Sequence, residues 1–273
     1  IHCGLVGSEM CIRDRFVDPV FADIGAWDTP SVIAATFAFG TQIYFDFAGY
    51  SLMAIGVARW FGYFIPKNFN DPYSSPSIAE FWRRWHMSLS FWLRDYLYIP
   101  LGGNRKGPVK TYRNLMITMV LGGLWHGAAW SFVIWGAIHG AALSVHRFVM
   151  GGANGRSLVP ALKGVVGIVL TVALVFAAWV PFRAESLSDT LSVWAGVIGV
   201  RDGGPQSLSW VAFCVPLLLV IDSLFSQADK LKGLPKLPVF RNPSLYWAGM
   251  GCLAALALAL YPLKSAPFVY FQF

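Results

Sequence analysis

The sequence predicts an all-α membrane protein that crosses the bilayer several times. Of its 273 residues, 56% are hydrophobic and only 13% are charged, whereas a soluble domain carries about 25% charged residues. Several apolar runs reach about 20 residues, the length that a helix needs to cross the hydrocarbon core. The basic residues lie between these runs, as they do in the cytoplasmic loops of membrane proteins.

Charge and cysteine content exclude two other classes of protein. The net charge is +7, but nucleic-acid binding needs basic residues gathered on one solvated face. Here they are divided among loops, so we expect no nucleic-acid partner. The four cysteines form no Cys-x-x-Cys pair, so the sequence indicates neither a zinc site nor a redox motif.

Residues 1–15 have no secretory signal pattern, since no apolar core follows a basic start. We expect this segment to be non-native. Residues 16–273 are then expected to form the C-terminal part of a single membrane domain.

The first predicted span covers Ser31–Ala58 and contains one acid, Asp46. After a polar stretch, Ser77 and Glu80 have the spacing of a capping box, which opens a helix. We expect that helix to continue to Ile99 and to stop before Pro100. It is too charged to face lipid, which favours an interfacial or re-entrant helix packed on protein.

A tight loop is predicted over Gly102–Gly107, without the spacing of a phosphate-binding loop. The uncharged run that follows, Asn114–His146, is long for one span and short for two. We expect it to break at Gly127 and to cross twice. The remaining predicted elements are spans over Gly164–Phe182, Leu208–Phe225 and Leu245–Leu263 and a short amphipathic helix over Leu187–Val200.

Loop charges predict the orientation of these spans. Residues 59–113, 147–163 and 230–241 are basic and are expected on the cytoplasmic side. Acidic residues precede the first span and follow Phe182, so these two segments are expected outside.

Two histidines carry the chemistry that the sequence suggests. His126 lies in the uncharged run, where an ionisable side chain indicates a functional site. His86 lies between two tryptophan-rich turns. His126 and His139 would be about 140° apart on one helix, so we expect no metal site. Gly-x-Ser-x-Gly is absent, which leaves a histidine acting as a general base on a hydroxyl.

Structural roles are open for the same residues. His126 could bind a neighbouring helix, and His86 could be an interfacial residue near Ser90. His139 lies between Gly136 and Gly140, a spacing typical of close helix packing. Asp46 is a functional candidate as an acid within a span, or else a buried partner of Arg59.

Four runs of the chain carry a family resemblance: Gln42–Ser51 (QIYFDFAGYS), Phe81–Ser90 (FWRRWHMSLS), Trp92–Arg105 (WLRDYLYIPLGGNR) and Gly122–Gly127 (GGLWHG). Together they resemble the membrane-bound O-acyltransferase family, and in particular its alginate O-acetyltransferase branch. Similarity is densest from Ser31 to Arg147.

The resemblance implies a multi-helix disc with interfacial or re-entrant helices around a central tunnel. It implies that His126 is the catalytic histidine and that His86 is the second, more variable active-site position. We expect His86 to face the tunnel close to His126 and Arg84 to brace the cytoplasmic side. The residues expected to line or brace the tunnel are Asp46, Arg84, Trp85, Arg94, Asp95, Asn104 and Trp125.

The same resemblance implies the partners. The acyl donor, acetyl-CoA or an acyl carrier thioester, acts on the cytoplasmic side, and no tightly bound cofactor is expected. An extracytoplasmic acetyl-relay protein or a polysaccharide such as alginate receives the acyl group. The expected location is the bacterial cytoplasmic membrane.

One departure from the branch leaves the substrate open. Leu52 follows Tyr50-Ser51, where the alginate branch usually has aspartate; leucine there is similar to the D-alanyl transferase of teichoic acids. The Leu101–Arg105 loop favours the alginate branch. A transporter with a His/Asp proton relay is the alternative from another class, although no internal repeat supports it.

Overall fold

The computed structural model describes residues 17–151, 164–184 and 186–199, and every regular element among them is helical. The predicted all-α class is therefore confirmed for this part of the chain. The predicted spans over Leu208–Phe225 and Leu245–Leu263 and the segment 1–15 lie outside the described residues.

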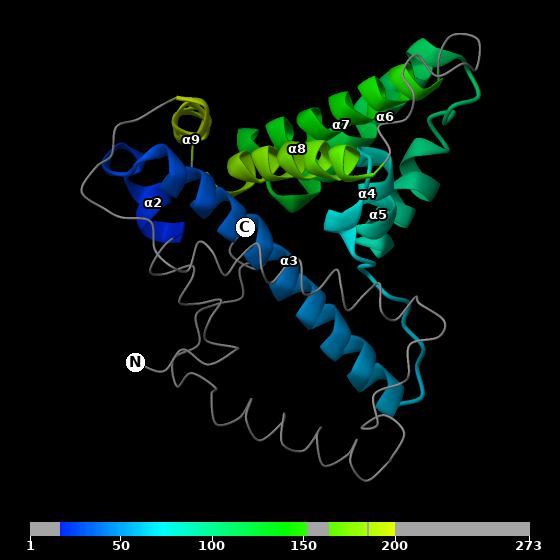
Figure 1. The fold of residues 1–273 in the computed structure, drawn as a ribbon. Coiled ribbons are helices and arrows are strands. Elements are labelled where there is room, and N and C mark those ends of the chain that lie inside the picture. Colours follow the sequence, from blue (N-terminus) through cyan, green and yellow to red (C-terminus); the bar gives the residue numbers. More distant parts are fainter. Residues whose placement is uncertain (1–16, 152–163, 185, 200–273) are drawn as a thin grey trace.

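The first predicted span is part of one long helix. Two short elements, α2 (Asp18–Ala22) and the 3-10 turn η2 (Ile24–Ala26), lead into α3 (Thr29–Trp60). Asp28 caps α3, because its carboxylate accepts the backbone N–H of Ser31 at 2.9 Å. Figure 1 shows α3 running past the remaining helices as the longest element of the fold.

The prediction of one continuous helix from Ser77 to Ile99 is wrong. After the 3-10 turn η3 (Pro72–Ser74) the chain forms α4 (Ile78–Arg84) and α5 (Met87–Leu93), followed by a π-helical turn, η4 (Arg94–Tyr98). The predicted N-cap is confirmed, since the Ser77 hydroxyl accepts the backbone N–H of Glu80 at 3.2 Å. The regular structure does end before Pro100, as expected.

The predicted break at Gly127 is confirmed, because it separates α6 (Pro108–His126) from α7 (Trp130–Gly151). These two helices pack closely through glycines. A Cβ on Gly136 would collide with the backbone carbonyl of Met119 on α6. Glycine here lets the two backbones approach, as predicted for the Gly136–Gly140 spacing.

The last described elements are α8 (Val165–Arg183) and α9 (Leu187–Ile198), which match the predicted span and the predicted amphipathic helix. Ser186 caps α9, since its hydroxyl accepts the N–H of Asp189 at 3.1 Å. In Figure 1, α6, α7 and α8 lie beside one another, α9 lies near the start of α3, and α4 and α5 lie at one end of the three-helix group.

By length and composition, two of the described helices are apolar enough to cross a membrane: residues Trp130–Met150 of α7, and α8. The helices α3 and α6 are long enough but do not reach the same hydropathy. In α6 the first turns carry Lys110 and Arg113, which lower the mean hydropathy. Among the described residues, helix length and hydropathy therefore identify fewer membrane spans than the sequence analysis predicts.

Aromatic side chains fill the core where α3, α4 and α8 meet. Tyr73 is buried there, and its hydroxyl donates to the carbonyl of Gly40 at 2.6 Å. The same hydroxyl accepts the indole N–H of Trp179 at 3.2 Å. These two hydrogen bonds join η3 to α3 and α8. Because α4 follows η3 directly in the chain, they also fix the position where α4 begins.

Candidate active site

His86 lies at the break between α4 and α5, where its backbone is left-handed with φ 41° and ψ 56°. A residue other than glycine costs about 1–2 kcal/mol in this conformation. Backbone hydrogen bonds hold both sides of the break. Asn70 N–H donates to the carbonyl of Arg84 at 3.0 Å, and Met87 N–H donates to the carbonyl of Asn68 at 2.8 Å.

His126 is the last residue of α6 and lies next to the turn into α7. Gly127 follows it, and a Cβ at this position would collide with the ring of Phe132. Only glycine therefore permits this turn with Phe132 in place. The turn leaves the imidazole of His126 projecting from the end of the hairpin.

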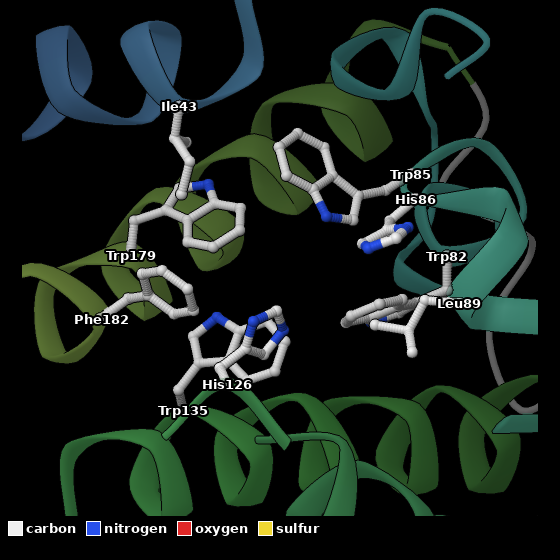
Figure 2. Close-up of a pocket in the computed structure, with 9 residues that line it drawn as sticks. All are labelled: Ile43, Trp82, Trp85, His86, Leu89, His126, Trp135, Trp179 and Phe182. Carbon is white, nitrogen blue, oxygen red and sulfur yellow. The ribbon is translucent and has the colours of Figure 1, made fainter. Parts of the chain in front are cut away.

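The two histidines line one pocket, together with aromatic and aliphatic side chains from α3, α4, α5, α7 and α8 (Figure 2). The other lining residues are Ile43, Trp82, Trp85, Leu89, Trp135, Trp179 and Phe182. The cavity is small, about 10 Å³, which is room for about one water molecule. No acid lines it among the described residues, so its walls are almost wholly hydrocarbon and aromatic.

Ring contacts connect the histidines through Trp125. The centroid of the His86 ring lies 6.3 Å from that of Trp125, and the His126 ring lies 5.0 Å from the same indole. The structure thus brings together the two residues for which a shared site was expected. Trp125 itself is 57% exposed and forms the outer side of this contact.

Burial governs the protonation of His86. Removal from water, and after it the nearby His126, lowers the pKa of His86 to about 3. Because desolvation penalises the charged form, His86 is neutral at physiological pH.

Asn68 holds His86 from the side opposite the pocket. Its Oδ1 lies 3.3 Å from Nδ1 of His86 and accepts the backbone N–H of Ser88 at 3.2 Å and its hydroxyl at 3.0 Å. Its amide nitrogen donates to the hydroxyl of Ser51 at 3.3 Å. Asn68 therefore links α3, the polar segment and the start of α5.

Arg84 braces α4 instead of entering the pocket. Its Nε donates to Glu80 at 3.0 Å, and its Nη1 donates to the hydroxyl of Ser74 at 3.0 Å and the carbonyl of Asp71 at 3.4 Å. The carboxylate of Glu80 thus binds arginine, while only Ser77 acts in the predicted capping box. These contacts hold α4 to η3, and the expected place of Arg84 on the cytoplasmic side stays a prediction.

Four other candidate residues lie outside this pocket. Arg94 and Asp95 pair with each other at 2.7 Å and are 54% and 45% exposed. Asn104 is exposed in the glycine loop, and Asp46 is half-buried on α3. These residues are not among those that line the pocket, whereas Trp85 is.

Sequence reasoning missed three residues that shape the site: Asn68, Tyr73 and Trp135. Asn68 and Tyr73 belong to the polar stretch 66–76, which has no periodicity that would mark a buried residue. Trp135 lies nine residues after His126, and it faces His126 only because the hairpin folds back at Gly127. Within the described residues, no group of three metal-ligating side chains forms a metal site.

Comparison with known proteins identifies a family whose model covers this part of the chain. The model of the membrane-bound O-acyltransferase family matches residues 27–175, a range that contains both pocket histidines. The chain is 52% identical over 165 residues to a probable alginate O-acetylase of Azotobacter vinelandii, covering 60% of this chain and 32% of that protein.

Two further relatives are named for different activities. The chain is 44% identical to the peptidoglycan O-acetyltransferase of Helicobacter pylori, over 65% of this chain and 32% of the relative. It is 36% identical to the teichoic acid D-alanyltransferase of Bacillus subtilis, over 41% of this chain and 30% of the relative. The chain thus spans about a third of the length of the curated relatives it matches.

Proposed function

The chain belongs to the membrane-bound O-acyltransferase family, and on that premise we propose that it transfers an acyl group, in particular acetyl, to a hydroxyl acceptor. The observation that carries this proposal is the pairing of His126 and His86 in one buried pocket. Neither a metal ligand set nor a serine motif offers another mechanism among the described residues.

In this mechanism His126 is the general base. A neutral imidazole has a lone pair on one ring nitrogen, so it can take the proton of the acceptor hydroxyl as the oxygen attacks the acyl carbonyl. The apolar walls of the pocket exclude bulk water, which would otherwise compete as the acceptor. His86, held neutral by burial, positions or polarises one of the reacting groups.

We propose a polysaccharide outside the cytoplasm as the final acceptor, reached directly or through an acetyl-relay protein. Identity to the alginate and peptidoglycan O-acetyl transferring relatives supports acetyl as the group. The donor would be acetyl-CoA or an acyl carrier thioester on the cytoplasmic side. The pocket would then be the narrowest part of a tunnel through a multi-helix disc in the bacterial cytoplasmic membrane.

D-alanyl transfer to teichoic acid is the second candidate. Leu52 and the relatedness to D-alanyltransferases favour it, although the identity of 36% is lower than that to the alginate relatives. The transporter hypothesis loses its basis, because a family of acyltransferases accounts for the intramembrane histidine.

The test is acyl transfer by membranes that contain the full-length protein, with radiolabelled acetyl-CoA and with a D-alanyl carrier protein as donors, and with alginate and peptidoglycan as acceptors. His126→Ala should reduce transfer by about 10²–10⁴-fold. Transfer within about threefold of wild type at equal membrane content would contradict the role of a general base.

His146→Ala is the matched control. His146 lies on α7 outside the pocket and is only partly buried, so its loss should leave transfer unchanged. His139→Ala, an obvious alternative, is unsuitable. Its ring is fully buried and its Nδ1 accepts the indole N–H of Trp82 at 3.3 Å, so its removal would damage the fold.

A further inference from the structure

The indole N–H of Trp135 is an unusual polar group in this pocket. Trp135 is 2% exposed and lines the cavity beside His126. Its Nε1 has no hydrogen-bond partner among the described residues. Since a buried donor without an acceptor costs free energy, its presence in an apolar pocket calls for a function.

Two other indoles of the pocket use their N–H groups within the fold. Trp82 donates to Nδ1 of His139 at 3.3 Å, and Trp179 donates to the hydroxyl of Tyr73 at 3.2 Å. These tryptophans hold helices together. Trp135 makes no such bond to the described residues, and Figure 2 shows its indole nitrogen on the ring edge that faces Phe182 and the cavity.

The position of Trp135 relative to His126 is set by the backbone. Their ring centroids lie 5.2 Å apart at an angle of 84°. The two residues lie on the two arms of the α6–α7 hairpin, whose spacing is fixed where Gly136 contacts the backbone of α6. A donor and a base are thus held in one geometry, which catalysis by preorganised groups requires.

We propose that Trp135 donates its indole N–H to the acyl carbonyl oxygen during transfer, a role that rests on the proposed function. The acceptor oxygen forms a bond to the carbonyl carbon while its proton passes to His126. The π electrons of the acyl carbonyl move onto the carbonyl oxygen, and the indole N–H of Trp135 stabilises the negative charge on that oxygen. The carbonyl then re-forms, and the leaving group departs with its bonding electrons and takes the proton from His126.

An uncharged indole suits this position. Negative charge develops only in the transition state, and in a pocket of low polarity each hydrogen bond to it is strong. A lysine or arginine would have to be buried there as a charge in the resting protein. The competing explanation is that the N–H points at the ring of Phe182, whose centroid lies 5.6 Å from that of Trp135.

The first experiment is Trp135→Phe in the full-length protein, with kcat and KM for the acyl donor measured in membranes. Loss of one such donor typically lowers kcat by about 10²–10³-fold, and KM should stay nearly constant because the bond forms in the transition state. Trp194→Phe is the matched control. It also loses an indole hydrogen bond, to the carbonyl of Ala177 at 3.0 Å, but it lies on α9 and does not line the pocket.

Because phenylalanine leaves a void, a second variant preserves the shape. Benzothienylalanine at position 135 replaces the N–H by sulfur with the ring system intact. The kcat of this variant should fall as far as that of Trp135→Phe. Its midpoint of thermal unfolding in detergent should equal that of the wild type. A kcat within about threefold of wild type for this variant would overturn the proposal and favour the contact with Phe182.

A binding measurement separates this proposal from the proposed function. A phosphonate analogue of the tetrahedral intermediate should bind wild type at least tenfold more tightly than the benzothienylalanine variant, whether or not turnover is observed. Equal binding would overturn the role of Trp135 alone. A different result is possible, in which His126→Ala leaves transfer intact while binding of the analogue still depends on Trp135. In that case His126 would not be the general base, and the role of Trp135 as hydrogen-bond donor would stand.

Discussion

Nδ1 of His86 lies 3.3 Å from Oδ1 of Asn68, and this contact favours the tautomer whose proton is on Nδ1. The backbone N–H of Ser88 donates to the same Asn68 atom at 3.2 Å, so that atom is the amide oxygen and not its nitrogen. An amide oxygen only accepts, so this contact is a hydrogen bond in the tautomer that carries its proton on Nδ1. Its Nε2 then presents a lone pair on the side of the ring opposite Asn68, where the pocket lies.

Asn68→Ala should therefore impair catalysis without removing either histidine. The proton of His86 would no longer be fixed to Nδ1 and the ring would lose its lateral support. We expect kcat to fall by about 10–100-fold, in the range that loss of orienting partners costs in other sites. Ser51→Ala is the control, because it removes only the hydrogen bond to the Asn68 amide nitrogen. Equal kcat values for the two variants would contradict the positioning role.

The left-handed backbone at His86 predicts a difference between two substitutions of similar size. Asparagine tolerates this conformation, whereas a β-branched side chain does not. His86→Val should therefore be less stable than His86→Asn by about 1–2 kcal/mol. Chemical unfolding in detergent, followed by tryptophan fluorescence, measures this difference. Equal stability of the two variants would mean that the break at His86 relaxes at little cost.

Close packing of α6 against α7 predicts that Gly136→Ala is destabilising. Its Cβ would enter space occupied by the Met119 carbonyl, which the backbones can relieve only by moving apart. Such overpacking costs about 1–3 kcal/mol, and the midpoint of thermal unfolding in detergent should fall. Gly56→Ala is the control, because no atom lies within 4 Å of a Cβ on that residue of α3. It should be neutral or stabilising by about 0.5–1 kcal/mol.

Elements set by local sequence were predictable. The apolar runs identified α3, α7 and α8, and Gly127 identified the break between α6 and α7. The spacing of Gly136 and Gly140 correctly indicated helix packing beside His139. In each case the residues that determine the element lie inside it, so their pattern can be recognised in the amino-acid sequence.

Elements set by distant contacts were not predictable. The capping pattern at Ser77 and the helix-compatible residues after it favour one helix to Ile99. The break at His86 is instead flanked by two backbone hydrogen bonds: the carbonyl of Asn68 accepts the N–H of Met87, and the N–H of Asn70 donates to the carbonyl of Arg84. Both asparagines lie well before the break in the chain. The role of Trp135 was hidden for the same reason, since its neighbour His126 lies on the other arm of a hairpin.

The remaining prediction concerns orientation. Lys106 and Asp189 are separated by the helices α6, α7 and α8, so they lie on opposite sides of the membrane if all three cross it. The basic segment around Lys106 is expected inside and the acidic segment around Asp189 outside. Single cysteines at these two positions, in a background without native cysteines, should react with an impermeant thiol reagent from opposite faces.

This labelling experiment also tests α6 directly. By hydropathy α7 and α8 are apolar enough to cross, whereas α6 is not, because its first turns carry Lys110 and Arg113. If only α7 and α8 crossed, both cysteines would be labelled from the same face. We expect opposite faces, because α6 packs along α7 through Gly136 and shares its depth, and because the basic residues lie at the end of α6 far from His126. Labelling from one face would place the start of α6 and the acidic segment together and would contradict the predicted orientation.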